Sequence, residues 1–330
     1  MERKKINTLI LSAGRRVELV KLFKKALKKI DIEGKIVAVD INNTAPALQF
    51  ADEYYLISRI DSENYIEDLI SICLKEDIDL IIPTIDTELL KLAKNREKIE
   101  KLTKAKINLS SLEVIEICRD KLKTQEFFEK NNFGVPKLVS EKDILEEKFK
   151  FPLFIKPFNG SSSINTFKVT NKSELIFFKN YISKPIIQEF IEGEEYTIDV
   201  FLDFESNPIT IVPRRRLATR SGEISKGLIV KNKRVIENIK RLVKILKPIG
   251  HITIQCMDTK EGIKYIEINP RFGGGAPMSI SAGADSCVNL YKIILGEKLT
   301  YTEEYKENLL CVRYDETLYV DKEKDVIFNV

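Results

Sequence analysis

The chain lacks several features that mark large classes of protein. Its only histidine, His251, begins an apolar strand and is expected to be structural, which leaves no histidine triad and removes most zinc chemistry. The five cysteines show no CxxC spacing, and an odd number of dispersed thiols fits a reducing cytosol. No stretch approaches about 18 apolar residues, and no signal-peptide pattern or low-complexity segment is evident. We therefore expect a cytoplasmic protein with no membrane partner.

An excess of charge of one sign is also missing. The 330 residues include 54 lysines and arginines against 50 aspartates and glutamates, a net charge of +4. Lysines are scattered among glutamates, as on solvated helix faces, so we expect no nucleic-acid partner. Hydrophobic residues make up 43% of the chain, enough to build packed cores. The length favours two or three compact units.

The stretch 255–275 is the most informative part of the sequence. It contains two apolar strands joined by a short polar turn, and a hairpin closing around 260–261 brings Gln255 opposite Glu267. Because side chains alternate along a strand, one face of the second strand carries Glu267, Asn269 and Arg271. Oxygen ligands of this kind suit Mg²⁺, and a neighbouring arginine suits phosphate. The alternative is a half-buried hairpin with a solvated polar face.

The first third of the chain alternates strands with helices. Apolar strands are predicted at 8–12, 35–39 and 79–83, with helices at 16–30 and 64–75 between them. This order implies a parallel, Rossmann-like sheet. A dinucleotide-binding interpretation, with Asp40 on a ribose, is weak because the segment 12–16 has one glycine where that fingerprint needs three. At the end of the third strand, 83–88 is predicted either to contact substrate or to begin a helix with Glu88 in its first turn.

Two segments in the middle of the chain have the composition of a phosphate site. Helices are predicted at 112–118 and 121–131, and a strand at 151–157 that carries Lys156 near its end. A small-residue loop follows before a strand resumes at Ile164, and its residues are Gly160, Ser161, Ser162 and Ser163. Backbone N–H groups of such a loop can approach an anion and the lysine adds a point charge, although the same residues also form ordinary hairpin turns. Farther on, a dense basic run at 213–227 offers Arg216, Arg220 and Lys226 to an anionic ligand; a solvated face is the alternative.

The order and spacing of these motifs resemble the ATP-grasp superfamily. Within it, the residues from about 6 to about 300 are most similar to the large chain of carbamoyl-phosphate synthase and to related single-copy carboxylate–amine ligases. The resemblance implies an α/β fold, with a Rossmann-like pre-ATP-grasp domain followed by a two-lobed α+β ATP-grasp domain. The expected boundaries are 1–111 for the first domain, 112–187 for the first lobe and 188–330 for the second lobe with the C-terminal segment.

The resemblance also implies roles for individual residues. Lys156 and Lys121 correspond to lysines on the nucleotide phosphates, and Glu195 to the ribose ligand. The segment that forms the adenine hinge in the family corresponds to Gln188, Glu189, Phe190 and Ile191, although many relatives have glutamate where this chain has Gln188. The metal ligands correspond to Gln255, Glu267 and Asn269.

The implied activity is a ligase reaction that uses ATP with Mg²⁺, or Mn²⁺ as an alternative metal. A small carboxylate is converted to an acyl phosphate, and an amine, or a thiol, then displaces the phosphate. Two other interpretations stay open: a kinase for bicarbonate or carbamate that resembles carbamoyl-phosphate synthase, and a non-catalytic ATP-binding module. Small-molecule substrates are the expected partners, and a homodimer is compatible with the resemblance.

Overall fold

The computed structural model describes residues 5–158, 164–220, 222–321 and 326–327. Its first part is a parallel five-stranded sheet in the order β3-β2-β1-β4-β5, which confirms the predicted Rossmann-like architecture. The strands are β1 (Thr8–Ile10), β2 (Ile36–Asp40), β3 (Glu53–Leu56), β4 (Leu80–Ile82) and β5 (Lys106–Ile107). The three central strands, β2, β1 and β4, are short, buried and largely apolar on both faces, as a sheet covered by helices on both sides requires.

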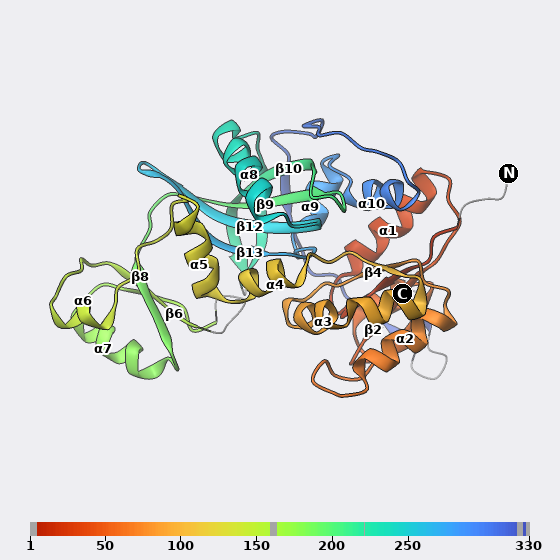
Figure 1. The fold of residues 1–330 in the computed structure, drawn as a ribbon, viewed down its shortest axis with the longest axis horizontal. Helices are drawn as coiled ribbons and strands as arrows, with labels where there is room; N and C mark the ends of the chain where they lie inside the picture. Colours follow the sequence, from red (N-terminus) through yellow and green to blue (C-terminus); the bar gives the residue numbers. More distant parts are fainter. Residues whose placement is uncertain (1–4, 159–163, 221, 322–325, 328–330) are drawn as a thin grey trace.

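Helices cover the two faces of this sheet. The first face packs against α1 (Val17–Lys29) and the 3₁₀ segment η1 (Pro46–Phe50), and the second against α2 (Tyr65–Lys75) and α3 (Asp86–Thr103). Alternation along β1 explains the division, because Ile10 belongs to the first core and Leu9 to the second. The whole domain lies at the right of Figure 1.

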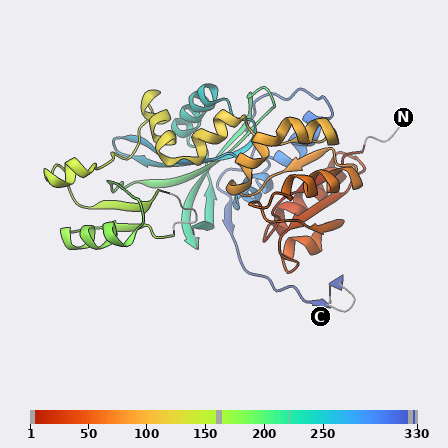
Figure 2. The ribbon, with the colours of Figure 1, turned by 60° about the horizontal axis from the view of Figure 1, so that its bottom comes forward.

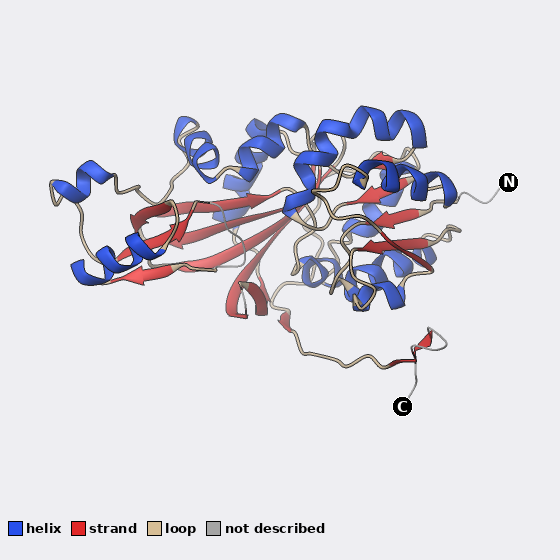
Figure 3. Ribbon diagram, turned by 90° about the horizontal axis from the view of Figure 1, so that it is seen from below, coloured by secondary structure: helices blue, strands red, loops and turns tan. Residues whose placement is uncertain are grey.

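The second part of the chain is built on an antiparallel six-stranded sheet in the order β13-β12-β9-β10-β11-β14. Its strands are β9 (Glu194–Leu202), β10 (Pro208–Arg220), β11 (Glu223–Ile229), β12 (Gly250–Thr259), β13 (Gly262–Asn269) and β14 (Leu310–Val312). One face is covered by α8 (Lys233–Leu246), with α4 (Leu112–Arg119) and α5 (Lys121–Lys130) against β13. Figure 3 shows helices above this sheet, and the long strands of the sheet extend toward the first domain.

A smaller lobe projects from the far end of the large sheet. It consists of a three-stranded sheet, β7-β6-β8, with two helices packed on it. The elements are α6 (Glu141–Leu145), β6 (Leu153–Pro157), β7 (Phe167–Val169), α7 (Lys172–Tyr181) and β8 (Pro185–Glu189). The lobe occupies the left of Figure 1, so the large sheet lies between it and the first domain.

The segment after β13 ties the large sheet to the first domain. It contains α9 (Ala276–Ser281) and α10 (Ser286–Ile294), which pack against α1. Phe23 of α1 makes edge-to-face contacts with Phe272 and Tyr291, each with ring centroids 5.7 Å apart. The shared apolar core fixes the position of the residues that follow β13 relative to the first domain.

Most predicted elements are present, with a few differences. The strand expected to resume at Ile164 begins at Phe167, and the basic run 213–227 lies on two paired strands, β10 and β11. The long β-strands were not expected there because charged residues dominate the run, but cross-strand pairing and burial of one face override that local preference. The domain boundaries at 111/112 and 187/188 stay predictions.

After β14 the chain leaves the large sheet and runs to a short pair of strands, β15 (Val320–Asp321) and β16 (Val326–Ile327). Figure 2 shows this segment extending below the body of the molecule. None of the helices in the described ranges is long and apolar enough to cross a membrane.

Candidate functional site

Two adjoining chambers follow the exposed face of the large sheet. The lobe chamber, about 410 Å³, lies between the small lobe and the large sheet, and the front chamber, about 530 Å³, lies between the large sheet and the first domain. They share a wall of side chains from four different elements, among them Lys121, Arg216, Gln255 and Glu267. A ligand in one chamber therefore lies next to a ligand in the other.

The lobe chamber contains the predicted lysines. Lys156 lies near the end of β6 and lines the chamber, and burial, together with the neighbouring charge of Lys121, lowers its pKa to about 8 against a smaller opposing effect of Glu267. Lys121 begins α5 and donates to the carbonyl of Pro157 at 2.9 Å; burial lowers its pKa as well. Two cations held close together and partly out of water favour a bound polyanion such as a triphosphate.

The predicted hinge lines the same chamber. Gln188 is buried, and Glu189 accepts a hydrogen bond from the backbone N–H of Lys137 at 2.9 Å, which ties β8 to the segment that precedes α6. Phe190 and Ile191 continue the chamber wall where the strand ends. On β9, Glu195 reaches the chamber and forms an ion pair with Arg216, with 3.2 Å between Oε1 and Nε.

The predicted metal ligands are adjacent on the hairpin of β12 and β13. Gln255 lies directly opposite Glu267, and the two strands are joined by Lys260 and Glu261, as expected from the sequence. The amide of Asn269 donates to Glu267 Oε1 at 2.8 Å. All three are oxygen donors with a single carboxylate, and no cluster of three or more His, Cys, Asp or Glu that could hold a metal occurs in the described ranges. This donor set fits Mg²⁺ completed by water and phosphate oxygens, and not a structural zinc.

Arg271 occupies a different setting from the one expected. It lines the front chamber, but its Nε and Nη2 both donate to Asp86 Oδ2, at 3.1 and 2.6 Å. Asp86 is the first residue of α3 in the first domain, so the guanidinium that was predicted to face phosphate is paired across the two domains. Sequence spacing could not show this pair because its members are 185 positions apart.

The residues at the end of β4 divide into two groups. Glu88 is fully buried and accepts from the backbone N–H groups of Thr84 and Ile85 and from the hydroxyl of Ser12. It therefore holds the start of α3, as the structural alternative predicted. Asp86, in contrast, lines the front chamber together with Thr84 and Ile85.

Asp40 also has a structural role, which weakens the dinucleotide interpretation further. Its Oδ2 accepts from the backbone N–H of Gly14 at 2.8 Å, and its Oδ1 from that of Asn42 at 3.0 Å. The carboxylate thus organises the turn after β1.

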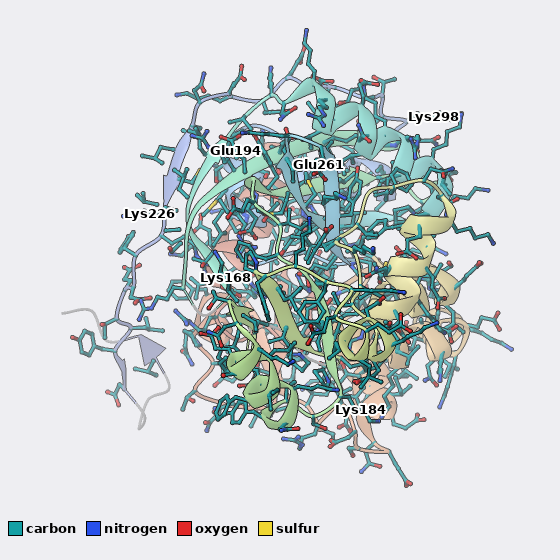
Figure 4. The ribbon with its side chains drawn as sticks, turned by 90° about the vertical axis from the view of Figure 1, so that its left-hand side faces the viewer. Lys168, Lys184, Glu194, Lys226, Glu261 and Lys298 are labelled. Atoms are coloured by element: carbon teal, nitrogen blue, oxygen red, sulfur yellow. The ribbon has the colours of Figure 1, made fainter. Side chains whose placement is uncertain are left out.

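Two of the three predicted basic residues lie away from the chambers. Arg220 is largely exposed and pairs with Asp315, and Lys226 is exposed on β11, at the edge of the molecule in Figure 4. Irregular pairing after Arg216 breaks the alternation of β10, so Arg216 lines both chambers and Arg220 does not. The predicted loop residues Gly160, Ser161, Ser162 and Ser163 lie outside the described residues.

A buried polar network behind the front chamber was missed from the sequence. Arg214 is 1% exposed and forms a two-point contact with Asp199, at 2.7 and 3.0 Å. Asp199 also accepts from the hydroxyl of Ser279 and lies 3.6 Å from Nε2 of His251, whose ring stacks on Phe272. Side-chain alternation could have indicated this from the sequence: if 208–220 is a strand, Arg214 lies on the same face as Arg216.

Comparisons with known proteins agree with this architecture. Residues 8–106 match the family model for the PylC-like N-terminal domain, and residues 118–275 match the model for the ATP-grasp domain. The chain is 26% identical to a carbamoyl-phosphate synthase from Methanobrevibacter smithii over 50% of this chain and 45% of that protein. It is 27% identical to D-alanine--D-alanine ligase B from Clostridium perfringens over 52% of this chain and 63% of that protein. It therefore spans about half to two thirds of the length of these curated relatives.

A solved structure has the same fold. The biotin carboxylase domain of 2-oxoglutarate carboxylase from Hydrogenobacter thermophilus, in complex with MgADP and bicarbonate, superimposes with a TM-score of 0.70 at 18% identity, covering 92% of this chain and 73% of that one. The two family models together span the first domain, the small lobe and the large sheet up to Gly275. The chain belongs to the ATP-grasp superfamily, with a PylC-like N-terminal domain preceding its ATP-grasp domain.

Proposed function

We propose that the protein is an ATP-dependent ligase that joins a carboxylate to an amine through an acyl phosphate. The observation that carries this proposal is the meeting of Gln255 and Glu267 with Lys121 along the wall shared by the two chambers, with Asn269 donating to Glu267 from the side of the front chamber. A nucleotide in the lobe chamber then has its phosphates next to a substrate in the front chamber. The names of the relatives, a synthase and a ligase, support the same class of reaction.

The lobe chamber supplies contacts for each part of the nucleotide. Its volume of about 410 Å³ is within the range of small-molecule sites. The base would lie against β8 at residues 188–191, the ribose hydroxyls would bind Glu195, and the phosphates would lie near Lys156 and Lys121. In this arrangement Glu195 would accept from the ribose hydroxyls beside its ion pair with Arg216, since a carboxylate has several acceptor sites.

The protein positions the carboxylate, ATP and the amine for this reaction and forms no covalent bond with any of them. An oxygen of the substrate carboxylate attacks the γ-phosphorus of ATP, the bond to the bridging oxygen breaks, and ADP leaves with the electron pair. The amine nitrogen then attacks the acyl carbon, phosphate leaves, and the nitrogen loses a proton. Lys156 and Lys121 hold the phosphates in line and offset their charge. When bound by Gln255, Glu267 and Asn269, Mg²⁺ would add charge neutralisation at the phosphate oxygens.

The test measures ADP release from Mg²⁺-ATP across a panel of small carboxylates, with bicarbonate included, each in the presence of hydroxylamine. Hydroxylamine converts an acyl phosphate into a stable hydroxamate, so it reports the intermediate before the amine is known. We expect ADP and hydroxamate to form in equal amounts with at least one carboxylate and to decrease together in Glu267→Gln at the same Mg²⁺ concentration. ADP release with bicarbonate alone would identify the kinase alternative. ATP binding without ADP release across the panel would indicate a non-catalytic module.

A further inference from the structure

Three buried polar atoms of residues that line the front chamber have no hydrogen-bond partner among the described residues: Oγ1 of Thr197, Nη1 of Arg214 and Nε of Arg216. The last of these lies 3.2 Å from Oε1 of Glu195 in an ion pair, which leaves the first two. Thr197 is 4% exposed and Arg214 1% exposed, and both line the chamber. Buried donors are nearly always satisfied in native proteins, because an unpaired one is costly. Two such donors on one wall therefore point to a ligand that accepts hydrogen bonds.

The two donors are neighbours on the sheet. Thr197 of β9 lies directly opposite Arg214 of β10, and on its other side it lies opposite Gln255 of β12. Nε and Nη2 of Arg214 both donate to Asp199, so the guanidinium is held in one orientation and Nη1 is not used in this contact. A donor fixed in this way needs little ordering when a ligand binds.

Two consecutive glycines let the backbone after β13 approach two guanidiniums of the front chamber closely. A Cβ atom on Gly275 would lie 2.5 Å from Nη1 of Arg214, and one on Gly274 would lie 2.5 Å from Nη1 of Arg16. Arg16 belongs to the first domain and also lines the chamber, where its Nη1 is only 3.4 Å from Glu223. Arg16, Arg214 and Thr197 thus line one chamber, and the two guanidiniums lie against neighbouring glycines that carry no side chain. Guanidinium groups match the planar, two-oxygen geometry of a carboxylate.

The carboxylate at this wall is taken as distinct from the reacting one because Arg214 and the predicted metal ligand Gln255 lie on strands that are not neighbours. The backbone of Arg214 is two strands away from Gln255, about 10 Å at the usual strand spacing. The same chamber contains the carboxylates of Asp86 and Glu223; Arg271 and Arg313 pair with them, but a carboxylate has further lone pairs that can accept from an ammonium group. A ligand with one negative and one positive group satisfies both sets.

We infer that Thr197, Arg214 and Arg16 form a subsite for the carboxylate of the amine substrate, which is therefore an α-amino acid. The role of this ligand as the amine substrate rests on the proposed ligase function. Binding at the subsite does not require turnover, so it can be measured separately. Neither the family models nor the relatives assign these three residues.

The test is a binding experiment on the full chain with Mg²⁺ and a non-hydrolysable ATP analogue. The melting temperature is recorded with a pool of α-amino acids and with a pool of the amines left after loss of the α-carboxylate, and calorimetry then gives a Kd for the strongest ligand. Thr197→Val keeps the shape of the side chain and removes the hydroxyl. Its matched control is Thr210→Val, which alters another buried threonine of the same sheet outside the chambers. Arg16→Gln is matched by Arg15→Gln, whose side chain is 82% exposed.

We expect stabilisation by the amino-acid pool and none by the amine pool. Thr197→Val and Arg16→Gln should each weaken the amino-acid Kd about tenfold or more, as loss of a hydrogen bond to a charged group does, and neither control should change it. Equal stabilisation by both pools, no stabilisation by amino acids, or unchanged Kd values in the two variants would overturn the subsite. Selective amino-acid binding without ADP release would leave the subsite standing and refute the ligase function instead.

Discussion

The depressed pKa of Lys156 makes ATP binding depend on pH in a range where few other groups titrate. Burial and Lys121 lower this pKa to about 8, so the ammonium is charged below pH 8 and neutral above it. If only the charged form binds the phosphates well, the apparent Kd equals the intrinsic Kd divided by the charged fraction. That fraction is about 0.9 at pH 7 and about 0.09 at pH 9, and the Kd for Mg²⁺-ATP should therefore rise about tenfold between them.

Calorimetric titrations of Mg²⁺-ATP at half-unit steps from pH 7 to pH 9.5 measure this dependence. Lys156→Met should bind ATP more weakly at pH 7 and show a flatter profile, because the titrating charge is gone. Lys123→Met serves as the matched control, since Lys123 is exposed on the same helix as Lys121 and lies outside both chambers. A wild-type Kd that is the same at pH 7 and pH 9, or an equally steep profile in Lys156→Met, would refute the reasoning.

Three further predictions concern charged pairs. Glu267→Gln removes the only carboxylate of the proposed metal set, so the Mg²⁺ concentration for half-maximal ADP release should rise at least about tenfold. Asp86→Asn leaves Arg271 without its partner; the free energy of unfolding should fall by about 1–3 kcal/mol, while ATP binds no more weakly. Asp199→Asn breaks the buried pair with Arg214 and should cost about 3–5 kcal/mol. Burial alone would raise the pKa of Asp199, but Arg214 and His251 hold it well below its usual range, so Asp199 should contribute to a fall in wild-type stability as the pH drops below about 4, and this contribution should be absent in the variant.

Each of these predictions has a measurement that can contradict it. Wild-type metal dependence in Glu267→Gln would mean that the hairpin face is merely solvated. Denaturant unfolding of Asp86→Asn with an unchanged midpoint would show that its pair with Arg271 contributes nothing to stability. For Asp199→Asn, urea unfolding should show a smaller decrease in stability from pH 7 to pH 3 than the wild type, and a decrease as large as that of the wild type would assign the acid sensitivity to other groups.

The sequence by itself determined the features that depend on local pairing. Gln255 and Glu267 face each other because a two-residue turn fixes the register of a hairpin, and alternation then carries Asn269 to the same face. The Rossmann-like order of the first domain followed from buried apolar strands separated by amphipathic helices. Lys156 could be located because it ends an apolar strand beside a small-residue loop.

Only the tertiary structure decided which basic residues line the chambers and which residues they pair with. Arg214 and Arg216 face inward while Arg220 faces solvent, because the pairing of β10 with β11 becomes irregular after Arg216. Arg271 pairs with Asp86, and Thr197 lies beside Arg214, only because strands and domains distant in the sequence pack together. Side-chain alternation can be counted along one strand, but the neighbour across the chamber is set by the packing of α1 against the segment after β13, which no local pattern encodes.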